Sequence, residues 1–304
     1  MSSTLTQTRP AAPAARPDAT EPRFGQVTCC SSAGFHSIAY TEWGDPHAAR
    51  VALCVHGLTR QGRDFDPLAV ALAQSGYRVI CPDLAGRGRS GWLGNPSDYA
   101  LPQYASDMTM VLARSGAAEI DWIGTSLGGL TGMHVAAMAQ APIRRMVIND
   151  VGPDLPWHAL SRLGGNVRNM PKSFANFYAA EAYFREVLAP FGRLGDTEWY
   201  HLTKYSITRT DDGRFRLLVD PRIGQVFHPA LFFNLSLWRQ WDSIRCPVMV
   251  LRGEHSDLLP PDVARSMTGR GPRATLVEFP ECGHAPALMD HRQIGTVVQW
   301  LTRD

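Results

Sequence analysis

Short apolar runs alternate with helical patterns from residue 50 onward, and this rhythm constrains the fold most. The apolar runs are β-branched and nearly continuous, as strands buried on both faces are, and they span 51–55, 77–81, 119–123, 143–148, 247–251 and 274–279. Helical patterns follow at 66–74, 102–115, 126–140, 261–268 and 291–301. The alternation predicts right-handed βαβ crossovers and an α/β fold. Two earlier runs, 25–30 and 36–41, predict an antiparallel entry pair, which completes a mostly parallel eight-stranded sheet with helices on both faces.

One stretch, 152–241, breaks this rhythm. It lacks the strand–helix alternation and instead carries aromatic-rich helical segments at 174–188 and 199–206 between Pro and Gly residues. We interpret it as a helical lid inserted into a core domain of residues 24–151 and 242–304. The first 23 residues are rich in Ala, Pro, Thr and Arg and contain little apolar surface, which predicts a disordered tail.

Composition excludes several classes of function. The 30 basic and 28 acidic residues nearly cancel, so nothing points to nucleic acid. No run approaches the ~20 apolar residues of a membrane span. The six cysteines show no zinc-type spacing, so no metal is expected, and the adjacent Cys29 and Cys30 fit two strand residues facing opposite ways. Reduced cysteines in apolar runs favour a cytoplasmic location, although the acid-poor, hydroxyl-rich start of the chain is also weakly typical of an organelle transit peptide.

The segment Gly124-Thr125-Ser126-Leu127-Gly128 follows an apolar run and opens a helical pattern. A G-x-S-x-G sequence in that setting is typical of a serine held on a sharp strand-to-helix turn with its Oγ exposed. Glycines on both sides remove the Cβ atoms that would collide in such a turn. Ser126 is therefore the candidate nucleophile, the alternative being a glycine-rich helix start with a capping serine.

At this point the chain resembles the α/β-hydrolase superfamily over nearly its whole length. His56-Gly57-Leu58 is similar to the family's oxyanion loop, which implies that the backbone N–H groups of Leu58 and Leu127 hold the developing oxyanion and that His56 organises the loop or borders the pocket. The segment 83–90, beginning at Asp83, resembles the family's D-x-x-G-x-G-x-S turn; a phosphate-binding loop is disfavoured there because it lacks the lysine of a P-loop.

The resemblance also implies the rest of a catalytic triad. A serine hydroxyl needs a neighbouring base, and imidazole can serve near neutral pH. His284, in Gly283-His284 after the last apolar run, matches the family's histidine loop. Spacing after Gly253-Glu254 favours Asp257 as the acid that orients the imidazole, and Asp150, at the end of the run 143–148, is the main rival.

The inserted stretch is expected to cover the nucleophile with an apolar pocket. Trp157, Tyr178 and Phe184 are the candidate pocket residues there, although most aromatic residues of this stretch are expected to pack the lid against the core. The same stretch carries eight arginines, one of which could clamp a substrate carboxylate, namely Arg162, Arg168, Arg185, Arg193, Arg209, Arg214, Arg216 or Arg222.

The sequence thus predicts a serine hydrolase, of carboxylesterase type, that cleaves an ester or lactone of a small or medium acyl substrate through an acyl-enzyme. No cofactor is expected, the partner is a small-molecule substrate, and the oligomeric state stays open between monomer and homodimer. Two other hypotheses share the fold. One is a hydrolase of C–C bonds in ring-fission β-diketones that uses the same triad, and the other is a non-enzymatic receptor.

Overall fold

The computed structural model describes residues 20–226 and 235–303. The predicted disordered tail therefore lies outside the described residues up to position 19. The first strand begins at Arg23.

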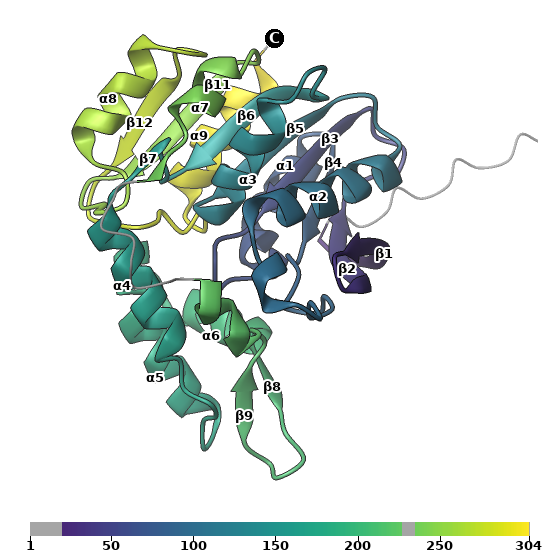
Figure 1. Cartoon of the computed structure of the whole chain (residues 1–304), viewed down its shortest axis with the longest axis vertical. Coiled ribbons are helices and arrows are strands. Elements are labelled where there is room, and N and C mark those ends of the chain that lie inside the picture. Colours follow the sequence, from purple (N-terminus) through teal and green to yellow (C-terminus); the bar gives the residue numbers. More distant parts are fainter. Residues whose placement is uncertain (1–19, 227–234, 304) are drawn as a thin grey trace, which may run out of the picture.

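Eight strands form one sheet in the order β1-β2-β4-β3-β5-β6-β11-β12 (Figure 1). The strands pair in parallel except at the β1–β2 and β2–β4 edges, which are antiparallel. Their bounds are β1 Arg23–Ser31, β2 Gly34–Trp43, β3 Arg50–Val55, β4 Tyr77–Pro82, β5 Ile120–Thr125, β6 Ile143–Asn149, β11 Val248–Gly253 and β12 Thr275–Phe279. The predicted α/β sheet, including its antiparallel entry pair, is confirmed. Cys29 is buried and Cys30 exposed on β1, as expected of neighbouring strand residues.

Helices cover both faces of the sheet. The apolar side chains of α1 (Asp66–Gln74) and α9 (His291–Thr302) pack on one face. Those of α2 (Leu101–Ser115), α3 (Leu127–Ala136), α7 (Trp238–Ser243) and α8 (Pro261–Gly269) pack on the other. Alternate residues of β3 pack on opposite faces of the sheet, since Leu53 and Val55 belong to one buried cluster and Cys54 to the other.

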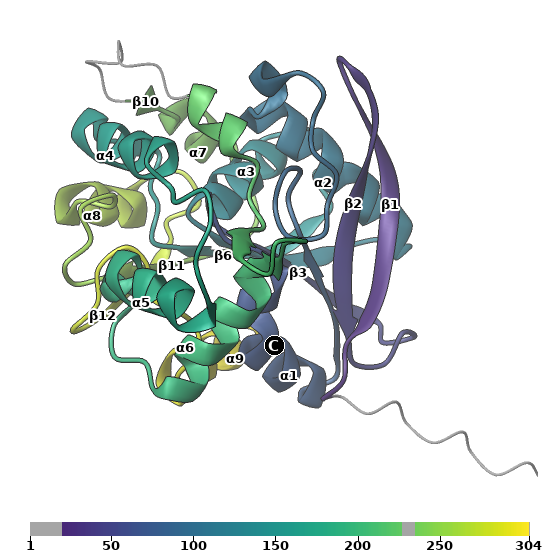
Figure 2. The same cartoon turned by 90° about the horizontal axis from the view of Figure 1, so that it is seen from below.

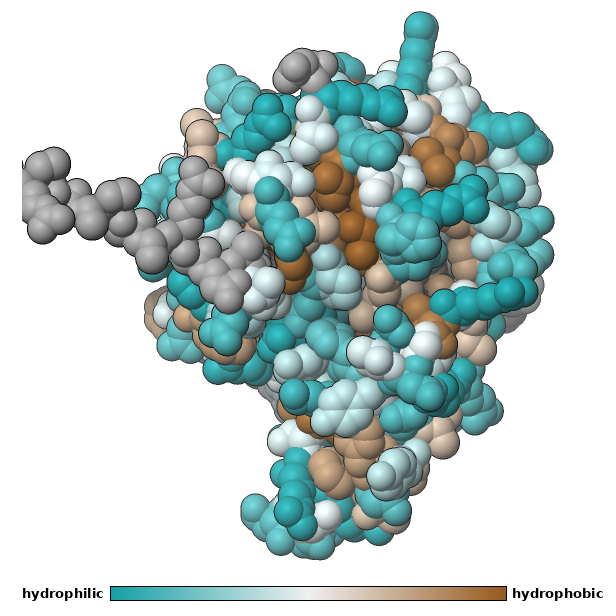
Figure 3. Space-filling model, turned by 180° about the vertical axis from the view of Figure 1, so that it is seen from behind, coloured by the Kyte–Doolittle hydropathy of each residue, from teal (hydrophilic) through white to brown (hydrophobic). Residues whose placement is uncertain are grey.

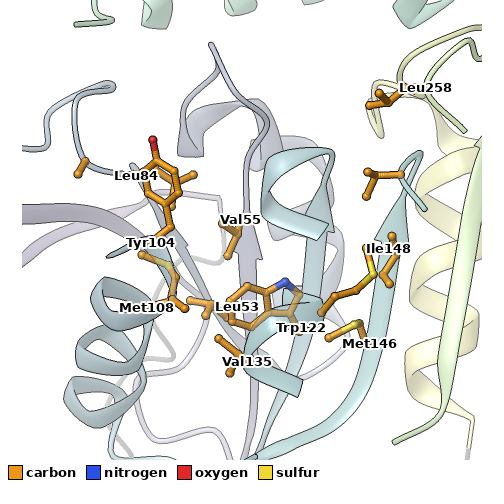
Figure 4. Close-up of a cluster of buried hydrophobic side chains, with 14 of the residues drawn as sticks. Leu53, Val55, Leu84, Tyr104, Met108, Trp122, Val135, Met146, Ile148 and Leu258 are labelled. Carbon is orange, nitrogen blue, oxygen red and sulfur yellow. The ribbon is translucent and has the colours of Figure 1, made fainter. Parts of the chain in front are cut away.

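Trp122 is the central side chain of the larger cluster. It is fully buried on β5, with Leu53 and Val55 from β3, Met146 and Ile148 from β6 and Val135 from α3 around it (Figure 4). Its indole N–H donates to the carbonyl of Gly128 at 3.1 Å, which satisfies the one polar atom of the buried ring. This hydrogen bond therefore connects the buried core to the first turn of α3.

The inserted segment follows β6. It contains β7 (Asp154–Leu155), α4 (Trp157–Arg168), α5 (Phe177–Val187), the 3₁₀ helix η3 (Ala189–Phe191), α6 (Asp196–Ser206), β8 (Ile207–Arg209), β9 (Phe215–Leu217), the 3₁₀ helix η4 (Pro221–Val226) and β10 (Leu235–Ser236). Figures 1 and 2 show α4, α5 and α6 gathered on one side of the sheet domain. The short strands β7 and β10 pair with each other, so the two ends of the segment meet.

This segment is not wholly helical, contrary to the prediction. β8 and β9 form an antiparallel hairpin that projects beside α5 in Figure 1. Its turn contains Gly213 in the left-handed region at φ 80°, a conformation that glycine adopts without strain. The sequence signal that could have predicted this hairpin is Asp-Asp-Gly at 211–213, which lies between two short runs containing β-branched or aromatic residues.

None of the helices in the described residues has the length and hydropathy needed to cross a membrane. Figure 3 shows a face covered mainly by hydrophilic residues, on which apolar residues form separate patches.

Candidate active site

Ser126 lies on a sharp turn between β5 and α3. Its backbone has φ 52° and ψ −114°, a conformation that is strained for a residue with a side chain. Its N–H donates to the carbonyl of Asn149 at 2.9 Å. A Cβ atom at Gly124 would lie 2.4 Å from the backbone of Gly128, and one at Gly128 would lie 1.9 Å from the carbonyl oxygen of Val55. Only glycine therefore fits at positions 124 and 128. Helix α3 begins at Leu127, one residue later than the sequence pattern predicted, because Ser126 is not in a helical conformation.

His284 lies on the loop between β12 and α9, and its side chain meets Ser126. The two residues are 158 positions apart, and His284 Nε2 is 3.0 Å from Ser126 Oγ. The side-chain amide of Asn149 donates to Thr125 Oγ1 at 3.1 Å and to the carbonyl of Pro286 at 2.8 Å. Asn149 thus ties the turn that carries the serine to the loop that carries the histidine. The sequence reasoning did not identify this residue.

The carboxylate next to His284 is Asp150 and not Asp257, so the predicted acid is corrected. His284 Nδ1 is 2.8 Å from Asp150 Oδ2, which also accepts from Ser256 Oγ at 2.7 Å. Asp150 Oδ1 accepts from the N–H of Gly253 at 2.8 Å. The Asp150 side chain is fully buried, and these three donors compensate the loss of water around its charge.

Asp257 is hydrogen-bonded to Arg162 and not to His284. On the loop after β11, the Ser256 hydroxyl donates to Asp150, whereas Asp257 lines the cavity and accepts two hydrogen bonds from Arg162 of α4, each 2.8 Å long. Spacing along one loop could not reveal which neighbour faces the histidine. The available signal was the position of Asp150 directly after β6, which lies between β5 and β11 in the sheet and ends at the same edge.

The loop after β3 lies against Ser126, since a Cβ atom at Gly57 would be 3.6 Å from Ser126 Cβ. His56 holds this loop: Nδ1 is 2.7 Å from the carbonyl of Gly57, and Nε2 accepts the N–H of Leu84 at 2.8 Å. Complete burial lowers the pKa of His56 from 6.5 to about 3, because a charged ring could not be hydrated there. His56 is therefore neutral and structural.

The turn that begins at Asp83 supports the same loop. Asp83 accepts the N–H groups of Gly62 at 2.7 Å and Arg89 at 2.9 Å, and burial raises its pKa to about 6. Arg87 of this turn is fully buried and donates from Nε to the carbonyl of Leu58 at 2.8 Å. The turn is thus a structural brace for residues 56–58, and Arg87 is a contributor that the sequence reasoning missed.

A cavity of about 620 Å³ opens above Ser126 and His284. Leu58 and Phe184 line it, and Phe184 is buried. The other residues expected at the pocket are not part of its lining. Trp157 and Tyr178 are 44% and 80% exposed, because both lie on helix faces turned to solvent. His56 lies beneath the loop and not in the cavity.

Another polar cluster occurs away from the cavity. Cys29, His36 and Asp107 bring potential metal-ligand atoms within 4.8 Å of one another. They supply three ligands where structural zinc usually has four, and burial together with Asp107 raises the pKa of Cys29 to about 12, which opposes a thiolate ligand. His36 Nε2 is 3.0 Å from Asp107 Oδ1, so this cluster joins β2 to α2.

The fold and the site define a hydrolase. A family model for the alpha/beta hydrolase fold matches residues 51–290, and the chain belongs to that family.

Individual proteins agree with this assignment. The chain is 42% identical to a 3-hydroxybutyrate-oligomer hydrolase of Cupriavidus necator over 92% of its own length and 98% of that protein. Among solved structures, an alpha/beta hydrolase from Novosphingobium aromaticivorans is similar with a TM-score of 0.81 and 32% identity, covering 92% of this chain and 99% of that one. A protein from Rickettsia typhi aligns with a TM-score of 0.87 and 28% identity over 93% and 99%.

Proposed function

We propose that this protein is a serine hydrolase that cleaves carboxylic esters through an acyl-enzyme. The observation that carries the proposal is the hydrogen-bonded chain from Ser126 Oγ through His284 to the buried carboxylate of Asp150. In this hydrogen-bonded chain, His284 Nε2 accepts the proton of Ser126 while Ser126 Oγ attacks the ester carbonyl. Asp150 keeps the proton on Nδ1 and stabilises the imidazolium that forms. His284 then protonates the departing alcohol, and in the second half it activates the water that releases the acid.

Backbone N–H groups of Leu58 and Leu127 are the proposed oxyanion donors. Leu127 is the first residue of α3, so its N–H has no partner within the helix. Leu58 lies on the loop that His56 and Arg87 brace. A donor fixed before the reaction contributes about 10² to 10³ in rate, and the braced loop supports this assignment.

The proposed substrates are esters of short hydroxy acids, including their linear oligomers. The similarity to a 3-hydroxybutyrate-oligomer hydrolase along nearly both entire chains supports this class. The cavity volume of about 620 Å³ lies within the roughly 300 to 1,000 Å³ of small-molecule sites. In this proposal residues 152–241 act as the lid of the core 24–151 and 242–304, since Leu163, Phe184 and Val187 line the cavity together with the core.

The test compares Asp150, which contacts His284, with Asp257, which sequence spacing favoured. Asp150→Asn leaves the packing nearly intact but removes the carboxylate from His284, so we expect kcat on p-nitrophenyl butyrate to fall by about 10³ to 10⁴. Asp257→Asn should reduce kcat by less than about tenfold, because Asp257 is hydrogen-bonded to Arg162 and not to His284. Ser126→Ala provides the baseline, and wild-type labelling by a fluorophosphonate at Ser126 checks the nucleophile.

Two outcomes would contradict the proposal. The first is a loss of activity in Asp257→Asn as large as that in Asp150→Asn or larger, which would contradict Asp150 as the acid that orients His284. The second is wild-type turnover of p-nitrophenyl butyrate and of the 3-hydroxybutyrate dimer no faster than Ser126→Ala. Circular dichroism of each variant verifies that it is folded.

A further inference from the structure

Two arginines border the cavity, and they differ in how far solvent reaches them. Arg60, on the loop after β3, binds Asp64 through Nε and Nη2 at 2.6 and 2.8 Å. Its guanidinium lies 5.2 Å from the centre of the Phe184 ring, and its side chain is 7% exposed. This guanidinium is therefore largely closed to bulk solvent, although the side chain lines the cavity.

Arg162 is the accessible cation of the pair. It lies on α4, its side chain is 42% exposed, and it lines the same cavity as Ser126 and His284. Asp257 accepts from Arg162 Nε and Nη2, each at 2.8 Å. A guanidinium has five N–H donors. The two hydrogen bonds to Asp257 therefore leave both donors of Nη1 and one of Nη2 for another acceptor.

We propose that Arg162 binds the free carboxylate of the substrate, with Asp257 as the residue that positions the guanidinium. This inference rests on the proposed ester hydrolysis. A linear oligoester of a hydroxy acid ends in one carboxylate, and the remaining Nη1–Nη2 edge of Arg162 presents two parallel donors to such a group. The carboxylate held by Arg162 places a nearby ester bond of the same molecule over Ser126. Substrates with a free carboxylate are therefore preferred over their neutral esters.

The exposure of the Arg162–Asp257 ion pair favours a role in substrate binding over a role in folding stability. Both of its members are 42% exposed, and exposed pairs contribute little to folding. Asp257 binds along the Nε–Nη2 edge, which fixes the plane of the guanidinium and reduces the rotamer freedom that binding would otherwise remove. The residue first expected to be the catalytic acid is thus assigned to specificity.

The experiment uses the full chain and a matched pair of substrates, the 3-hydroxybutyrate dimer with its free carboxylate and the methyl ester of the same dimer. Arg162→Met keeps most of the length and apolar volume of the side chain but removes its charge. We expect KM for the free acid to rise about 10- to 100-fold, as for a lost hydrogen bond between charged groups, and KM for the methyl ester to change by less than about twofold. Arg162→Lys should recover part of the loss.

The control is Arg270→Met. Arg270 makes a similar exposed double contact with Asp242 but does not line the cavity, so neither KM should change. The proposal is overturned if Arg162→Met affects both substrates equally, or neither, while wild-type protein cleaves both. Failure of the proposed function would give a different result, because wild-type protein would then cleave none of the three substrates: the free-acid dimer, its methyl ester and p-nitrophenyl butyrate.

Discussion

The neutral state of His56 predicts a specific loss of stability in acid. His56 has a pKa of about 3 in the folded protein and an ordinary value of 6.5. Between these values the unfolded chain binds a proton that the folded protein excludes, so stability is complete above pH 6.5 and falls as the pH is lowered toward 3. Lowering the pH from 7 to 5 should cost about 2 kcal/mol through this one side chain.

The assay is urea unfolding at both pH values, for wild-type protein and His56→Gln. Glutamine has no titrating group, and its side-chain oxygen can still accept the N–H of Leu84. We expect the variant to be less stable at pH 7 but to lose about 2 kcal/mol less than the wild type between pH 7 and 5. Other groups titrate equally in both proteins, so their contributions cancel in this difference.

His47→Gln is the matched control, because His47 is exposed, and it should behave as the wild type does. If His56→Gln shows the same loss between pH 7 and 5 as the wild type, the reasoning about burial is refuted. His56→Asn provides a second variant, measured in the same way, in case glutamine does not fit beneath the loop.

Two further outcomes are expected. Gly295→Ala in α9, where an added Cβ meets nothing within 4 Å, should raise the free energy of unfolding by about 0.5 to 1 kcal/mol in urea. Gly128→Ala should yield little folded protein on expression, because the new Cβ would lie 1.9 Å from the carbonyl oxygen of Val55; normal folding would contradict the geometry of the turn.

Much of the sheet domain could be predicted because its local signals agree with one another. The strands and helices of the core follow from apolar runs and helix-start residues, and the helix 66–74 matches α1 at both ends. The turn that carries Ser126 contains the glycines that it requires. In each case the determinants lie within a few residues of the feature.

Features that depend on distant segments could not be predicted in the same way. Whether Asp150 or Asp257 faces His284 depends on how the loops after β6 and β11 fold against each other, and residue spacing within either loop does not reveal this. The exposure of Trp157 and Tyr178 likewise depends on which face of α4 or α5 turns inward. Both helices are amphipathic, and an aromatic ring is compatible with either face.

The pairing of β7 with β10 has a consequence for how such an enzyme can change. The chain enters and leaves the inserted segment at adjacent points, so the segment is attached to the sheet domain at one place. Residues between these points can be lengthened, shortened or replaced without moving the strands that carry Ser126 and Asp150. Under the proposed function, evolution or design could therefore alter substrate choice separately from the reaction chemistry.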